Sequence, residues 1–289
     1  TKLANIGVVV IDNESKAIVD NFLLPTFLGS KVYSFANIDL ETAAASALTS
    51  AIVDAAYGAT FATSEVLLNG DRAPGNRTEE TNLGDLITDA MVWSVVKDGG
   101  IEQVEPNAVV GITNGGGIRA AINVGDITKK DLNTVLPFGN TVAVVYVTGA
   151  ELLEALEAST FCTPDSIGGY PQTTGIVWTL DTTKAYDAGD VYVLDGKESS
   201  YYAPKTINRV TIESINGEAF DETATYAVVT NNFCAAGGDT YNVFGRSDAR
   251  FDTGIPMDEA VTAYIEEVLN GVVTEEAYGA PSGRETQIK

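Results

Sequence analysis

The order of helical and strand-like patterns along the 289-residue chain is the feature that most constrains its fold. Continuous apolar runs of strand length, such as NAVVGIT at 107–113 and TVAVVYV at 141–147, alternate with segments in which apolar residues recur at helical spacing. The helical pattern is clearest after Thr81 and in MDEAVTAYIEEVLNG at 257–271. No repeat or low-complexity tract interrupts this order. It therefore predicts an α+β domain with mixed α/β layers, rather than a solenoid or a helical bundle.

Residues typical of helix N-termini mark where three of these helices should begin. Thr81 directly precedes the longest periodic segment. Thr128 is followed three residues later by Asp131, and Thr148 is followed at the same spacing by Glu151. In such a pair the threonine side chain and the acidic side chain each bond a backbone N–H of the first helical turn. The spacing predicts helices that start immediately after each of the three threonines.

Four further strand-like runs precede the final helix: GIVWTLD at 175–181, DVYVLDG at 190–196, INRVTIESING at 207–217 and TATYAVVTN at 223–231. The segment EEAYGAPSGRETQIK at 275–289 shows neither pattern. We expect this C-terminal segment to fray, and the sequence assigns it no role.

Charge and hydropathy exclude two classes of partner. The chain carries 40 acidic and 17 basic residues, a net charge of −23. A nucleic-acid-binding surface needs clustered Lys and Arg to displace counterions, so no nucleic acid is expected as a partner. No uninterrupted apolar run reaches the roughly 18 residues of a membrane-spanning helix, so no membrane span is expected.

The chain contains no histidine. This absence removes the commonest zinc ligand and excludes Ser-His-Asp and Cys-His nucleophile systems. Cys162 and Cys234 are too few for a disulfide scaffold. One bridge between them and two separate buried thiols remain open alternatives.

Three consecutive glycines, Gly115 to Gly117, follow the apolar run that ends at Thr113. A phosphate-binding loop would need the spacing GxxxxGK[ST] or GxGxxG, and neither is present. The remaining interpretations are a turn with positive φ or a close approach of the backbone to another segment. The triplet would then orient Asn114 and Arg119 toward one ligand.

Two loops place a phenylalanine where no periodic pattern explains it. Phe138 lies in the turn LPFGNT, and Phe233 follows two asparagines in NNFCAAGGDTY. Each ring alone is more often part of the cover of a hydrophobic core. Together, two ring faces beside glycine-rich loops and amide or carboxylate groups suit a flat heterocycle, with a ribose on the carboxylate.

These motifs resemble those of the C-terminal domain of the 5′-nucleotidase family, which also includes UDP-sugar hydrolases and 2′,3′-cyclic phosphodiesterases. Five stretches occur in the family's order and extend over roughly residues 65–245. They are RTEETNLGDLITDAM (77–91), NGGGIR (114–119), LPFGNT (136–141), QTTGI (172–176) and NNFCAAGGDTY (231–241). The resemblance implies that this domain binds the nucleotide that a separate domain hydrolyses.

The resemblance also implies a role for individual residues. The two phenylalanines would stack on either face of the base, the aspartate would accept the ribose hydroxyls, and the arginines would face the phosphate. Arg72 is the weakest match, because its spacing from Arg77 is one residue longer than expected. The implied binding residues are Arg72, Arg77, Asn114, Arg119, Phe138, Asn140, Gly175, Phe233 and Asp239.

The family's N-terminal metallophosphatase domain, with its DxH and GNH[DE] motifs, has no counterpart here. We expect residues 1–38 to be remnant strands of that domain, 39–66 a linker helix and strand, and 67–289 the nucleotide-binding domain. The helix should run from an N-cap at Asp39 to Gly58, with Leu48 on its apolar face. The resemblance makes this helix a candidate hinge between the two domains.

A part of a longer enzyme with these features should bind a nucleoside monophosphate or related nucleotide but not hydrolyse it alone. No cofactor is expected in this chain. A pair of divalent metal ions, Zn, Mn or similar, is expected in the N-terminal domain, which is the other expected partner. The family resemblance further implies a secreted, periplasmic or cell-surface location, although the chain shows no signal peptide. Two alternatives remain: the same domain of a cyclic-nucleotide phosphodiesterase or nucleotide-sugar hydrolase, and a non-catalytic nucleotide- or protein-binding module.

Overall fold

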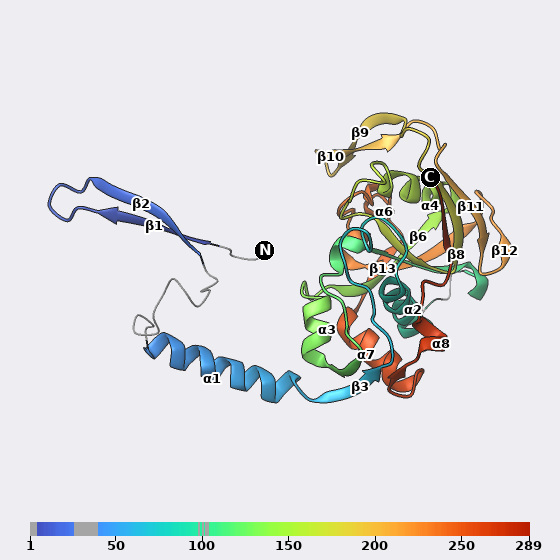
Figure 1. The fold of residues 1–289 in the computed structure, drawn as a ribbon. Helices are drawn as coiled ribbons and strands as arrows, with labels where there is room; N and C mark the ends of the chain where they lie inside the picture. Colours follow the sequence, from blue (N-terminus) through green and yellow to red (C-terminus); the bar gives the residue numbers. More distant parts are fainter. Residues whose placement is uncertain (1–4, 26–39, 98, 100, 102–103) are drawn as a thin grey trace. The chain divides into compact units, whose positions relative to one another are not determined.

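The computed structural model describes residues 5–25, 40–97, 99, 101 and 104–289. The chain divides into two units, Thr1–Ala56 and Tyr57–Lys289. Figure 1 labels many of the elements of both units.

The first unit consists of a hairpin and most of one helix. Strands β1 (Asn5–Ile11) and β2 (Ile18–Pro25) pair antiparallel, and helix α1 runs from Leu40 to Tyr57. This confirms the predicted helix, although its expected N-cap, Asp39, lies outside the described residues. No side chain of α1 is buried: Leu48 is 64% exposed and Ile52 is 61% exposed. The apolar face predicted for this helix is therefore uncovered by the described residues.

A five-stranded mixed sheet forms the centre of the second unit. The sheet order is β14 (Arg250–Pro256), β6 (Thr141–Thr148), β13 (Thr225–Asn231), β4 (Val109–Asn114) and β7 (Pro171–Thr174). β13 and β4 are parallel, whereas the other three neighbouring pairs are antiparallel.

Both faces of this sheet are covered, and β6 shows this most clearly. Val142 and Val144 point into one hydrophobic core, whereas Val145 and Val147 point into a second core on the opposite face. Successive side chains of a strand alternate between faces, so a strand buried on both sides reads as a continuous apolar run. This explains the run TVAVVYV.

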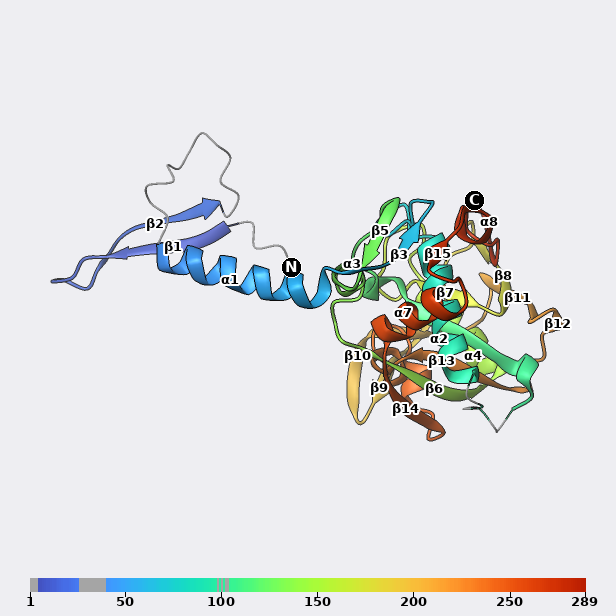
Figure 2. The same cartoon turned by 90° about the horizontal axis from the view of Figure 1, so that it is seen from below.

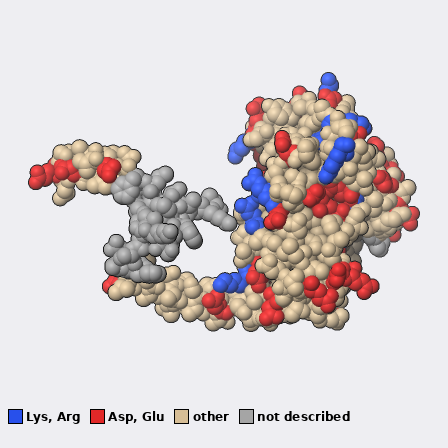
Figure 3. Space-filling model, in the orientation of Figure 1, with Lys and Arg blue, Asp and Glu red and all other residues tan. Residues whose placement is uncertain are grey.

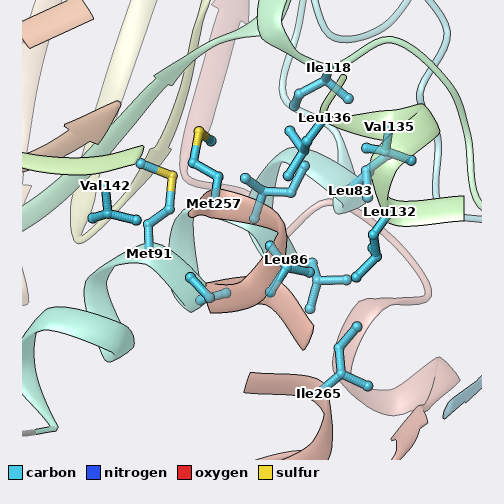
Figure 4. Packing of buried hydrophobic residues seen from close by; sticks show 14 of the residues in the cluster. Leu83, Leu86, Met91, Ile118, Leu132, Val135, Leu136, Val142, Met257 and Ile265 are labelled. Atoms are coloured by element: carbon cyan, nitrogen blue, oxygen red, sulfur yellow. The ribbon is translucent and has the colours of Figure 1, made fainter. Parts of the chain in front are cut away.

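The first core lies between the sheet and three helices: α2 (Asn82–Val96), α3 (Lys129–Val135) and α7 (Met257–Glu267). Figure 4 shows Leu86 and Met91 packing beside Met257, with Leu132 and Val135 nearby. The side chains of Thr81 and Thr128 cap α2 and α3 as predicted.

The second core lies between the sheet, helix α4 (Gly149–Ser159) and a four-stranded sheet. The predicted capping box of Thr148 and Glu151 is present at the start of α4. The strands of the smaller sheet are, in order, β12 (Glu218–Ala219), β11 (Val210–Ile215), β8 (Ile176–Asp181) and β16 (Glu285–Ile288).

The C-terminal segment is part of the fold, and the expectation that it would fray is wrong. It forms helix α8 (Glu275–Tyr278) and strand β16, which pairs parallel with β8 and ends near it in Figure 1. Arg284 lies 3.3 Å from Asp85 Oδ1 and 2.8 Å from Asp89 Oδ2, both on α2. These ion pairs and the strand hold the segment against the domain.

Two smaller sheets complete the unit. β15 (Val272–Val273), β3 (Thr60–Ser64) and β5 (Gly125–Thr128) lie side by side in Figure 2. β9 (Ala188–Leu194) and β10 (Lys197–Pro204) form a separate hairpin. The mixed helix and strand order predicted from the sequence is thus confirmed, as an α+β fold with mixed layers.

Candidate functional site

The candidate site lies where strands of the five-stranded sheet end, and five loops meet there. The two parallel strands β4 and β13 have their C-terminal ends at this site, with Asn114 and Asn231 as their last residues. The antiparallel strands beside them begin there, because Asn231 pairs with Val142 of β6 and Asn114 pairs with Pro171 of β7. The carboxyl ends of parallel strands are a common location for ligands in mixed sheets. The topology thereby brings together segments that are distant in the sequence.

The glycine triplet forms a 3₁₀ turn, Gly115–Gly117, directly after Asn114. None of the three glycines has a positive φ. A Cβ on Gly115 would lie 1.6 Å from the backbone oxygen of Asn76, and the Gly115 N–H donates to the Tyr170 oxygen at 2.7 Å. Of the two interpretations left by the sequence, close backbone approach is therefore the correct one.

A pocket of about 390 Å³ opens beside this turn. Gly116, Gly117 and Gly168 contribute to its wall. Gly168 was not predicted, because the pair of glycines at 168–169 belongs to no motif recognised in the sequence. Seven of the nine binding residues predicted from the sequence line this single pocket: Arg77, Asn114, Arg119, Phe138, Asn140, Phe233 and Asp239.

The two phenylalanines of the pocket are exposed rather than buried in either core. Phe138 is 60% exposed and Phe233 is 44% exposed. The interpretation of these rings as core cover is therefore wrong. A Cβ on Gly238 would lie 2.5 Å from the Phe233 ring, so the glycine at this position allows the ring to lie against the loop. The pocket thus has aromatic side chains on two separate loops.

A chain of side-chain hydrogen bonds links the polar residues of the pocket. Asn114 donates from Nδ2 to Asp239 Oδ2 at 2.8 Å. The Asn114 Oδ1 atom accepts from Asn231 Nδ2 at 3.0 Å. Asp239 has a left-handed backbone, with φ of 51°, a conformation that Asp tolerates better than most residues. Asn231 was not predicted, because a buried asparagine at a strand end resembles an ordinary helix cap in the sequence.

Three arginines lie in or beside the pocket. Arg77 and Arg119 also line a second hollow of about 280 Å³, together with Arg72. Arg119 donates to the Gly116 oxygen at 3.2 Å, and its guanidinium carbon lies 5.7 Å from the centre of the Phe138 ring. Arg72 donates from Nε to Ser166 Oγ at 3.2 Å.

The charges of these arginines are not neutralised by ion pairs with any carboxylate among the described residues. Desolvation, and then the neighbouring charges of Arg72 and Arg119, lowers the pKa of Arg77, while Asp239 acts in the opposite direction. Figure 3 shows basic side chains gathered along one flank of a surface that otherwise carries many acidic groups. Free guanidinium groups in such a cluster favour an anionic ligand.

Two of the predicted binding residues do not line the aromatic pocket. Arg72 lies in the adjoining hollow only. Gly175 lies between β7 and β8 with φ of 76°, and a Cβ there would meet the Asn216 side chain at 2.7 Å. The structure therefore places Gly175 at a turn outside the pocket.

The described residues offer no metal site and no disulfide. No group of three or more His, Cys, Asp or Glu side chains within them is arranged to hold a metal ion. Cys162 and Cys234 are free thiols, and burial raises the pKa of Cys234 to about 12. No described helix is long and apolar enough to cross a membrane.

Comparison with known proteins relates this domain to phosphoester hydrolases. Residues 59–246 match the family model "5′-nucleotidase, C-terminal domain". The trifunctional nucleotide phosphoesterase protein YfkN of Bacillus subtilis is 37% identical over 210 residues, which are 72% of this chain and 13% of that protein. Protein UshA of Escherichia coli is 31% identical over 199 residues, 69% of this chain and 29% of that protein.

A crystal structure of a 5′-nucleotidase precursor from Thermus thermophilus is similar in fold, with a TM-score of 0.69 and 29% identity. The match covers 99% of this chain and 50% of that one. The chain thus spans half or less of the length of these relatives. Because the family model covers most of the second unit, the chain belongs to the family of 5′-nucleotidase C-terminal domains.

Proposed function

We propose that this domain binds a nucleotide in the aromatic pocket and presents it to a hydrolytic centre in a separate domain. The observation that carries the proposal is the convergence of seven predicted residues from four loops on one pocket of about 390 Å³. Such a volume lies within the usual range for small-molecule sites. The family to which the chain belongs supports the same assignment.

The base would lie between Phe138 and Phe233. Both rings are exposed at the pocket, so a ligand covers apolar surface that is otherwise in contact with water. Stacking contributes roughly 1–3 kcal/mol per base and tolerates any base. Asn140, which lines the same pocket, would contact the edge of the base.

The sugar and phosphate would occupy the polar part of the pocket. Asp239 retains Oδ1 for ribose hydroxyls, because Oδ2 accepts the Asn114 amide. Arg77 and Arg119 would bind phosphate oxygens with their planar, fork-shaped guanidinium groups, and Arg72 would assist from the adjoining hollow. Gly175 remains a family-based proposal for the surroundings of the base, through its turn rather than as pocket lining.

The hydrolytic step is assigned to an N-terminal metallophosphatase domain with a pair of divalent ions, Zn, Mn or similar. This chain has no histidine, and its described residues hold no candidate metal cluster. Its residues would bind and orient the nucleotide. A secreted, periplasmic or cell-surface location is part of the same proposal.

The preferred phosphoester has one alternative with support of its own. The relative YfkN is described as a trifunctional nucleotide phosphoesterase. That name indicates more than one phosphoester, so the cyclic nucleotide and the nucleotide-sugar that the family resemblance implies remain alternative candidate substrates for the same pocket.

Isothermal titration of the 289-residue chain with adenosine, AMP and ribose 5-phosphate tests the proposal. We expect adenosine and AMP to bind in about the micromolar to millimolar range, with AMP tighter and ribose 5-phosphate weakest. If a correctly folded chain binds neither adenosine nor AMP at millimolar concentrations, the pocket is not a nucleotide site.

A further inference from the structure

We propose that Asn231 is a positioning residue that holds Asn114 and Asp239 in the orientation needed to select a ligand with free ribose hydroxyls. This inference rests on the proposed function, because it assigns a role within the same pocket. Asn231 does not line the pocket, and its side chain is fully buried. Its effect would act through the residues that it contacts.

The backbone of Asn231 is fixed by the sheet. It is the last residue of β13, paired with Val142 of β6, and β13 also runs parallel to β4. Residues of β13 are buried from Tyr226 onward. The Asn231 side chain therefore extends from a buried stretch of backbone.

Both hydrogens of the Asn231 amide have partners. Nδ2 donates to Thr113 Oγ1 at 2.9 Å and to Asn114 Oδ1 at 3.0 Å. An amide NH₂ has only these two donors, so the group is fully used. Because the Asn114 oxygen is turned toward Asn231, the Asn114 nitrogen faces the other way, toward Asp239.

This orientation decides how Asp239 can act. Asn114 Nδ2 donates to Asp239 Oδ2 at 2.8 Å. A flipped Asn114 would place its carbonyl oxygen against the carboxylate, and two acceptors cannot form a hydrogen bond. With the observed orientation, Oδ2 accepts from Asn114, whereas no hydrogen bond from the described residues reaches Oδ1, which is left for a ligand hydroxyl.

The side-chain oxygen of Asn231 accepts a hydrogen bond from a second segment. Oδ1 accepts from the Cys234 backbone N–H at 2.9 Å, which caps the short turn that carries Phe233. A cap alone needs only a side-chain acceptor, and Asp or Ser provides one as well as Asn. An ionised Asp cannot donate to Asn114, and the single hydroxyl of the shorter Ser cannot both replace Nδ2 toward Thr113 and toward Asn114, so the positioning role can be separated from the cap.

The test compares adenosine with 2′,3′-dideoxyadenosine by calorimetry on the full chain and on Asn231→Asp and Asn231→Ser. Both substitutions keep a capping oxygen and remove the amide donor. Asn232→Ser is the matched control, since Asn232 lies in the same turn but lines a different hollow with Arg250.

In the unsubstituted chain and the control, we expect adenosine to bind roughly ten- to a hundredfold more tightly than the dideoxynucleoside, as for hydrogen bonds to a charged group. In both Asn231 variants the ratio should fall to within about threefold, while affinity for the dideoxynucleoside, which depends on stacking, is nearly retained. A merely structural role would weaken both ligands equally.

Retention of the tenfold or greater ratio in either folded Asn231 variant would overturn the positioning role and leave the proposed function intact. Failure of the unsubstituted chain to bind adenosine would overturn the proposed function and this role with it. Should both variants fail to fold, side-chain amide NMR of the unsubstituted chain decides: the Asn231 and Asn114 resonances must shift with adenosine and not with the dideoxynucleoside. Equal responses to both ligands would contradict the role.

Discussion

Asn114 and Asp239 lie 125 positions apart in the sequence and are joined by a hydrogen bond of 2.8 Å between Nδ2 and Oδ2. The bond connects the end of β4 to the loop that follows the Phe233 turn. It uses one oxygen of the Asp239 carboxylate, and the other is the oxygen that we propose binds the ligand.

Replacing either aromatic ring of the pocket should weaken nucleoside binding without unfolding the domain. We expect Phe138→Ala and Phe233→Ala each to reduce adenosine binding by roughly 1–3 kcal/mol, because each removes one stacking face. Both rings are substantially exposed, so the free energy of unfolding should change by about 1 kcal/mol or less. Calorimetry and urea denaturation measure the two effects.

Phe244→Ala is the matched control for these substitutions. Phe244 is fully buried in the second core, and its truncation should cost about 3–5 kcal/mol of stability. Equal destabilisation by Phe138→Ala would contradict the assignment of that ring to the pocket.

The arginines should affect the phosphate and not the nucleoside. Arg77→Lys and Arg119→Lys keep the charge but lose the planar fork, so AMP should bind roughly tenfold more weakly while adenosine is unchanged. Arg246→Lys is the control, because Arg246 pairs with Glu154 at 2.7 Å and lies outside the pocket. If the affinities for adenosine and AMP fell by the same factor, these arginines would not act on the phosphate, and the assignment would be contradicted.

The C-terminal segment should contribute strongly to stability through Arg284. Arg284→Ala leaves Asp85, which is fully buried, and Asp89 without their cation, so we expect a loss of about 3–5 kcal/mol in unfolding free energy. Lys184→Ala breaks a more exposed ion pair with Asp181 and should cost about 1 kcal/mol or less. Similar effects of the two substitutions in chemical denaturation would refute this ranking.

Glu285 should make stability depend on pH. Burial raises the pKa of this carboxyl from 4.5 to about 7. Between these two pH values the folded chain keeps a proton on Glu285 that the unfolded chain has released. The contribution of Glu285 to the free energy of unfolding is therefore fully present below about pH 4.5 and is lost as the pH rises through about 7. The Glu285 carboxyl accepts hydrogen bonds from the Tyr170 hydroxyl and from Gln287 Nε2, whereas the Glu285 backbone N–H donates to Glu80 Oε2 at 3.1 Å.

Urea denaturation between pH 5 and 8 tests the sign of this effect. From about pH 5 to 7 the Glu285 contribution should decrease, and Glu285→Gln should reduce the slope of the profile, with the remainder due to Asp85, whose pKa burial also raises to about 7. An identical pH profile for the chain and the variant would show that Glu285 does not titrate in this window.

Much of the fold was predictable because local signals and global packing agree. The buried run of β6 and the capping threonines of α2, α3 and α4 identify their elements correctly. The C-terminal segment was mispredicted because its order depends on distant residues. Arg284 gains its partners from α2, and β16 gains its strand partner from β8. A sequence window around residue 284 contains none of them.

The site residues that belong to recognisable sequence motifs were predictable. Those whose role depends on how the strands pack together were not. Phe138, Phe233 and Asp239 stand in distinctive glycine-containing turns, and all three line the pocket. Gly168 belongs to no such motif, and Asn231 begins the motif NNFCAAGGDTY without any local sign that its side chain contacts Asn114. Their positions follow from the ends of β4 and β13, and that these ends lie together is visible only once the strand order is known.

A crystal structure of the chain with adenosine is the most direct test of the central claim. The account predicts a flat purine between the rings of Phe138 and Phe233, with ribose hydroxyls on the free oxygen of Asp239. A nucleoside bound at another place, with both rings still exposed to solvent, would contradict it.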